Sequence, residues 1–118
     1  MTTTEIHVEA TPEIIQKTIC AGIEEIGDFI VQSEFQSLLA ELYALPHEAR
    51  LRFVQDIIID NEQRLSRGIK VPEGMVIQRS TFADGRPTLF CVSKILPLAY
   101  PWHRVTITFD SSLEESSA

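Results

Sequence analysis

The chain of 118 residues carries 17 acidic side chains against 10 basic ones, a net charge of −7, and is 44% hydrophobic. This size and composition are typical of one globular domain with a modest core. An acidic surface repels phosphate, which argues against nucleic acid as a partner. No apolar run approaches the roughly 20 residues that a membrane helix needs. The first residues have no secretory pattern, so we expect a cytoplasmic protein with no membrane partner.

Composition and periodicity divide the chain into three parts. Residues 1–10 are interpreted as a flexible arm, residues 11–110 as a single α+β domain, and residues 111–118 as a disordered acidic tail. Within the domain, helical periodicity comes first and strand-like alternation follows.

The first predicted helix covers residues 11–30. Thr11 suits the N-cap and Pro12 suits the first helical position. Gly22 and Gly27 each weaken a helix by up to about 1 kcal/mol relative to alanine, or else they allow another element to approach closely. A buried stripe at helical spacing is predicted from Ile15, Ile19, Ile23, Ile26 and Ile30.

Two further helices are predicted before the strands. One begins at Ser33, because Ser33 and Gln36 have the spacing of a capping box. A proline separates it from a third helix that ends at Gly68, where a glycine follows cations of the last turn. We expect the charged residues of this third helix, including Arg50 and Arg64, to lie mostly outside its apolar stripe. That stripe comprises Leu51, Phe53, Val54, Ile57, Ile58 and Leu65.

Alternating patterns then predict a three-stranded antiparallel sheet, made of a hairpin over residues 75–95 and a strand over residues 103–109. The dipeptide Asp84–Gly85 is typical of a tight type I′ turn, which places Ile77 opposite Val92. The fold class is therefore α+β, with three N-terminal helices followed by the sheet in two layers. Three strands bury only one or two helices, so self-association as a homodimer stays open.

Motifs for chemistry are absent from the sequence: it has no glycine-rich phosphate loop, no His-Glu-x-x-His, no Cys-x-x-Cys and no Gly-x-Ser-x-Gly. We assign no catalytic residue, no metal site and no cofactor. Cys20 and Cys91 are expected to be reduced and buried as small hydrophobes; Cys91 beside His103 is the one alternative. Asp56 and Asp60 share a helix face and are interpreted as solvated rather than as a cation site.

A partner-binding surface is predicted on the strand half of the chain. Arginine binds carboxylates through two hydrogen bonds, and an edge strand accepts an extended peptide through its backbone. The locally basic strands therefore suit an acidic peptide or protein partner. The competing interpretation is that the strand cations only solvate the outer face of the sheet. The predicted partner-binding residues are Arg79, Arg86, Lys94, Trp102 and His103, the last two within the stiff aromatic linker 97–103.

The segment "GIKVPEGMVIQ", residues 68–78, follows an amphipathic helix and precedes "ILP" at 95–97. With these motifs, residues 50–97 resemble the nitrile-hydratase-like leader domain found in precursors of ribosomally made, modified peptides. A leader of that kind precedes a modifiable core, whereas here a further strand and an acidic tail follow. The resemblance therefore implies an accessory protein of a peptide-modifying system. The matching residues are Gly68, Ile69, Val71, Pro72, Glu73, Gly74, Leu96 and Pro97.

Three functions stay open on the sequence alone. The first is a non-catalytic binding or accessory module that docks a peptide or a partner enzyme. The second is a small enzyme with a pocket between the third helix and the sheet, using some of Arg79, Cys91 and His103. The third is a precursor peptide with a folded leader.

Overall fold

The computed structural model of the chain describes residues 11–79 and 88–109. It confirms the predicted α+β class, with helices followed by an antiparallel sheet in the order β1-β2-β3. The predicted turn at Asp84–Gly85, Arg86, the N-terminal arm and the C-terminal tail lie outside the described residues. The elements are α1 (Pro12–Ile30), α2 (Ser33–Ala44), α3 (His47–Phe53), the π-helical turn η1 (Val54–Ile58), α4 (Asn61–Ser66), β1 (Met75–Gln78), β2 (Phe90–Ile95) and β3 (Arg104–Phe109).

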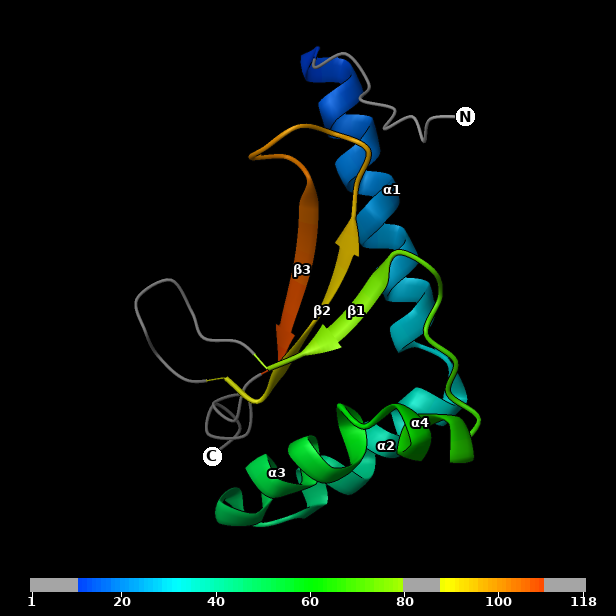
Figure 1. The fold of residues 1–118 in the computed structure, drawn as a ribbon, viewed down its shortest axis with the longest axis vertical. Coiled ribbons are helices and arrows are strands. Elements are labelled where there is room, and N and C mark those ends of the chain that lie inside the picture. The colour runs from blue at the N-terminus through cyan, green and yellow to red at the C-terminus, as the bar shows by residue number, and fades with distance from the viewer. Residues whose placement is uncertain (1–10, 80–87, 110–118) are drawn as a thin grey trace, which may run out of the picture.

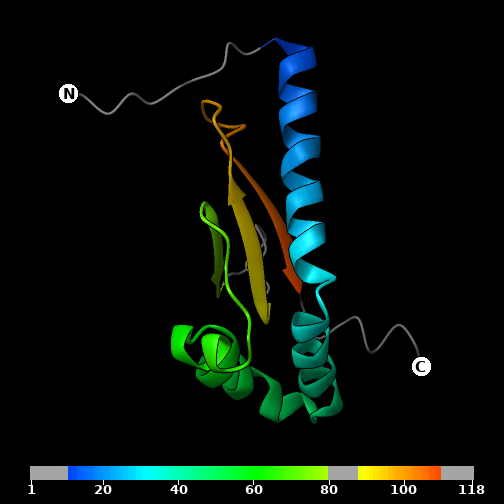
Figure 2. The same cartoon turned by 90° about the vertical axis from the view of Figure 1, so that its right-hand side faces the viewer.

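The long helix α1 runs along one face of the sheet, where it contacts β2 and β3. The shorter helices α2, α3 and α4 gather at one end of the sheet, as Figures 1 and 2 show from two sides. The predicted register is confirmed, since Ile77 pairs with Val92 and Val92 pairs in turn with Ile107. These three side chains therefore share the face that meets the helices.

Aromatic rings join the helices to the sheet. The Phe35 ring of α2 lies 5.0 Å from Phe29 of α1 and 6.4 Å from both Phe90 and Phe109. Phe90 and Phe109 stack across β2 and β3 with ring centroids 4.6 Å apart. Offset and edge-on aromatic pairs stabilise a core beyond the area they bury. The core thus has one centre, to which α1, α2, β2 and β3 each contribute a ring.

Helix α1 begins as predicted, because Thr11 Oγ1 accepts a hydrogen bond from the Ile14 amide at 3.3 Å. Its buried face differs from the predicted stripe. The buried residues are Gly22, Ile26 and Phe29, whereas Ile23 is 47% exposed. At 3.6 residues per turn, Ile23 lies about 100° around the helix from Gly22 and so turns away from the sheet.

The expected close approach is confirmed at Gly22 and wrong at Gly27. A Cβ atom at Gly22 would lie 2.7 Å from Leu96 Cδ2 and 3.0 Å from Val105 Cγ2, while one at Gly27 would meet nothing within 4 Å. Leu96 is buried and Val105 lies on the core face of β3. The absent side chain at Gly22 therefore lets α1 lie directly on the sheet.

The break between α1 and α2 falls at the predicted place for a different reason. Ser33 is the first residue of α2, and Gln32 is its N-cap without a side-chain hydrogen bond. The Gln36 side chain instead reaches back, and its Nε2 donates to Ile30 O at 2.8 Å. The predicted capping box is therefore wrong, because the Gln36 side chain binds a carbonyl at the end of α1 instead.

The prediction of one continuous third helix was wrong. It is divided into α3, η1 and α4, and the Ile59 amide donates to Val54 O at 2.9 Å, a π-type bond. Asp60 then acts as the N-cap of α4, accepting from the Gln63 amide at 3.0 Å. A π-type turn holds an additional residue, so the apolar stripe loses its phase there.

Four residues of this segment have exposures opposite to those expected. Leu51 is 40% and Leu65 53% exposed, whereas Arg50 and Arg64 are buried. Arg64 Nη1 donates to Ile58 O and Ile59 O at 2.7 and 2.8 Å, the carbonyls left free where η1 ends. Burial lowers the pKa of Arg64, and the nearby Asp60 carboxylate opposes this shift. The guanidinium thus satisfies the carbonyls at the helix break.

Arg50 plays the same part at the end of α2. Its Nε donates to Leu45 O at 2.9 Å and its Nη2 to Tyr43 O at 3.0 Å. The guanidinium also lies 5.3 Å from the centre of the Tyr43 ring, a cation–π distance. A buried arginine therefore joins α3 to the carbonyl end of α2.

The predicted stop at Gly68 is confirmed. Gly68 has φ +80°, its amide donates to Leu65 O at 3.0 Å, and the Ile69 amide donates to Arg64 O at 2.9 Å. This pair of bonds is the Schellman arrangement at the end of a helix. It directs the chain from α4 toward β1.

Alanine substitutions at the two glycines of α1 test the close approach. Gly27→Ala should raise the free energy of unfolding by up to about 1 kcal/mol, because alanine favours a helix. Gly22→Ala gains the same propensity but must displace Leu96 and Val105, so its urea midpoint should lie below that of Gly27→Ala. An equal or higher midpoint for Gly22→Ala would show that α1 does not need the contact.

Replacing Arg50 tests its role at the end of α2. Arg50→Met should lower the free energy of unfolding by about 1–3 kcal/mol, because buried carbonyls lose their donor. Arg52→Met is the matched control, since the Arg52 side chain is 83% exposed and only pairs with Asp56 at 3.2 Å; it should change stability by less than about 0.5 kcal/mol. Denaturant unfolding followed by circular dichroism measures both variants, and equal losses would contradict this role.

Candidate partner-binding site

An open apolar groove lies between the first half of α1 and the loop that joins β2 to β3. It encloses about 450 Å³, within the size range of small-ligand and side-chain pockets. Five of the lining residues come from one helix and the sixth from the loop. They are Pro12, Ile15, Gln16, Ile19, Cys20 and Trp102.

The β2–β3 loop is held at both ends and presents aromatic rings to solvent. The Leu96 amide donates to His103 O at 2.7 Å, and the Trp102 amide donates to Ala99 O at 2.9 Å. Tyr100 is 84% exposed and Trp102 44% exposed, and the Tyr100 ring lies 5.5 Å from that of His103. Trp102 is therefore fixed by its backbone beside α1 while much of its ring remains available.

The groove exists because α1 is longer than the strands it covers. The 19 residues of α1 span about 28 Å, whereas the six residues of β2 span about 20 Å. Figure 1 shows the first turns of α1 extending past the end of the sheet at which the β2–β3 loop lies. The half-buried Ile15 and Ile19 consequently face this loop instead of a strand.

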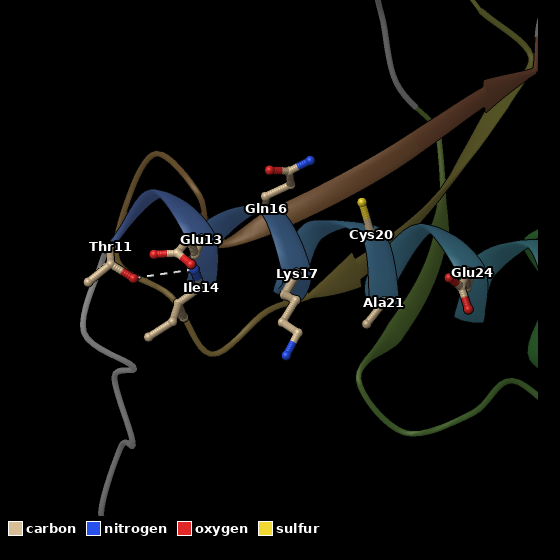
Figure 3. Close-up of a pocket in the computed structure, with 8 residues that line it drawn as sticks. All are labelled: Thr11, Glu13, Ile14, Gln16, Lys17, Cys20, Ala21 and Glu24. Carbon is tan, nitrogen blue, oxygen red and sulfur yellow. Dashed lines mark hydrogen bonds between the residues drawn. The ribbon is translucent and has the colours of Figure 1, made fainter.

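A second, more polar hollow lies beside the groove on the outer side of α1. It encloses about 720 Å³ and is open to solvent. Gln16 and Cys20 line both hollows, and Figure 3 shows them on one side of the helix. The whole lining comes from α1 and its N-cap: Thr11, Glu13, Ile14, Gln16, Lys17, Cys20, Ala21 and Glu24.

The structure brings two of the predicted site residues together and separates the others. Trp102 lines the groove and His103 follows it, with its Nδ1 atom buried and without a hydrogen-bond partner. Arg79 follows β1 at the other end of the sheet, where Gln78 pairs with Cys91. Arg79 is half-buried, and its Nε also has no partner.

Lys94 is engaged within the molecule. Its Nζ lies 3.3 Å from Glu25 Oε1 of α1 and donates to Glu73 O at 3.3 Å. The side chain is only 17% exposed. Lys94 therefore fastens the sheet to α1 and does not stand on a free rim beside Arg79.

The two cysteines differ in exposure. Cys91 is buried, as expected, but Cys20 is exposed, so its predicted burial was wrong. Cys91 pairs with Thr108, whereas His103 lies beside Leu96. His103 and Thr108 are five residues apart along the chain, about 17 Å, so Cys91 and His103 do not form the alternative thiol–imidazole pair.

No metal-binding cluster is present among residues 11–79 and 88–109, where no three His, Cys, Asp or Glu side chains are grouped. Asp56 pairs with Arg52, and Asp60 caps α4. Between η1 and the sheet, Val54 and Ile58 pack into the same core as Phe90. The region proposed for an enzyme pocket is thus occupied by apolar side chains.

Comparisons with protein-family models, with curated proteins and with solved structures found no match to this chain. The resemblance of residues 50–97 to a leader domain therefore stays a prediction. Of the helices in the described part of the chain, none has the length and apolarity needed to cross a membrane.

Thiol reactivity tests the placement of the two cysteines. In the native protein at pH 7, a thiol reagent should modify Cys20 rapidly and Cys91 only after unfolding, because Cys91 is 2% exposed. Mass spectrometry of the labelled peptides measures the modification of each cysteine. Cys20→Ser is the control, because Cys91 is then the only cysteine in the protein. Rapid native labelling of Cys91 would contradict this arrangement and revive the enzymatic alternative.

Proposed function

We propose that the protein is a non-catalytic binding module that docks a peptide, or a peptide segment of a partner enzyme, in the groove between α1 and Trp102. The observation that carries this proposal is the groove itself. It is apolar and open, and one wall is a partly exposed tryptophan on a backbone held by hydrogen bonds. Exposed aromatic residues beside aliphatic ones are the usual anchors of protein–protein contacts.

The size of the groove suits a transient contact. One leucine or phenylalanine side chain gains about 1.5–3 kcal/mol when it is fully buried. A groove of about 450 Å³ accepts only a few such side chains. Association also loses translational and rotational freedom, so an interface built on this groove is weak and exchangeable. A module that presents a substrate and then releases it needs such an interface.

The setting that we propose is the modification of ribosomally made peptides, for which the support is the likeness of residues 50–97 to a leader domain. In the structure the described residues of this range form most of α3, then η1, α4, β1 and β2, and Gly74 forms the turn into β1 with φ +83°. Under this proposal the protein is an accessory that brings a precursor and its enzyme together. Pathway enzymes would then be its partners.

Peptides selected from a random display library on the immobilised protein test the groove. The chain has one tryptophan, so occupation of the groove should shift the emission of Trp102. Trp102→Ala should weaken the selected peptides about tenfold or more, as loss of an aromatic anchor does. Tyr100→Ala is the matched control, because Tyr100 is on the same loop, is 84% exposed and does not line the groove.

Arg79→Glu separates this surface from the sheet edge predicted from the sequence. Affinity lost in Arg79→Glu but retained in Trp102→Ala would place binding at the far end of the sheet and overturn the groove. Peptides that bind without any change in Trp102 emission would overturn it as well.

A further inference from the structure

The outer face of α1 is acidic next to the groove. Glu13 and Glu24 are eleven residues apart, about three helical turns, and therefore share a face. Asp28 lies about one turn beyond Glu24. All three carboxylates are exposed. Lys17, the one basic residue of α1, lies on the same face four residues after Glu13, so three carboxylates stand against one ammonium there. The fourth acid, Glu25, is already paired with Lys94.

An apolar strip runs beside this acidic face. Pro12 and Ile19 line the groove, and Ile23, four residues after Ile19, is 47% exposed. Residues four apart lie above one another on a helix, so Ile23 extends the groove along α1. From Pro12 to Ile23 the strip is about 17 Å long, the length of about three turns of a partner helix.

We infer that this surface takes a cationic amphipathic segment of the partner. Its apolar side chains lie in the groove and along Ile23, and its lysines or arginines lie over the carboxylates of Glu13, Glu24 and Asp28. The inference rests on the proposed function and specifies the charge and pattern of the partner. The expected partner is therefore basic, whereas the sequence predicts an acidic partner from the cations of the strands. In the structure Lys94 is paired with Glu25, and Arg79 lies at the other end of the sheet.

Charge decides between this occupant and the others. A second copy of the chain would bring the acidic face of α1 against another of the same sign, and like charges across an interface are unfavourable. An acidic peptide would meet the same repulsion, in addition to the net charge of −7 of the whole chain. A cationic segment gains both the apolar contact and the attraction.

Two synthetic peptides of about 18 residues test the inference. Both carry leucines at helical i, i+3, i+4 and i+7 spacing, and the remaining positions are lysine in one and glutamate in the other. The lysine peptide should bind, shift the emission of Trp102 and slow the alkylation of Cys20, and its affinity should fall as salt is raised. The glutamate peptide should do none of these.

Charge-neutral variants locate the contact. The double variant Glu13→Gln, Glu24→Gln should weaken the lysine peptide about three- to tenfold. The control Glu48→Gln, Glu62→Gln removes the same charge from exposed positions on α3 and α4 and should leave the affinity within about twofold. Equal weakening by the two double variants would mean that only net charge matters and would overturn the inference.

The peptide pair also separates the two proposals. Equal binding of both peptides, with Trp102 shifted, leaves the groove in place and overturns the inference about charge. Failure of both peptides to affect Trp102 or Cys20 overturns the charge inference; peptides selected by display that also leave Trp102 unchanged would overturn the groove. Concentration-dependent dimerisation that slows alkylation of Cys20 without peptide would make a second copy the occupant and overturn the inference too.

Discussion

The position of α1 on the sheet depends on the contact at Gly22. There the helix backbone meets Leu96 of the β2–β3 loop and Val105 of β3 without an intervening side chain. The ion pair of Glu25 with Lys94, one turn further along, fastens the same contact. Since this point lies near the middle of α1, the first half of the helix must extend past the strands. The groove is a direct consequence of where the helix crosses the sheet.

Local signals were sufficient for the ends of most elements. Thr11 caps α1, Gly68 ends α4, and Ile77 pairs with Val92, because each depends on residues close in sequence or on strict alternation. The break after η1 could not be predicted in this way. The Arg64 guanidinium stabilises this break by donating hydrogen bonds to backbone carbonyls five and six residues away. The spacing of apolar residues in a sequence gives no sign of such a contact.

Arginine was also assigned to the wrong side of the helices. Charged residues are rarely buried without a partner, so the sequence pattern predicts Arg50 outside the apolar stripe. In the structure its partners are the backbone carbonyls of Tyr43 and Leu45. Every helix ends with free backbone carbonyls, whatever its sequence. Which side chain reaches them depends on the path of the chain in three dimensions.

The candidate site was predictable in part. The aromatic linker points to Trp102 and His103, but helical spacing assigns Ile15 and Ile19 to the core, because it does not give the length of α1 relative to the strands. One signal was overlooked. Alternation along β2 puts Lys94 on the same face as Val92, toward the helices, which argues against a free cation at this position.

Backbone geometry requires the two glycines of the segment GIKVPEG. Gly68 and Gly74 have φ values of +80° and +83°, which other residues seldom adopt, and a side chain at Gly74 would also crowd Lys94 Nζ, 3.1 Å away. Any chain that leaves a helix through a Schellman turn and enters an edge strand six residues later needs glycines at similar positions. Shared ancestry in this segment is better judged at Ile69 and Val71, whose side chains enter the core or pack against it.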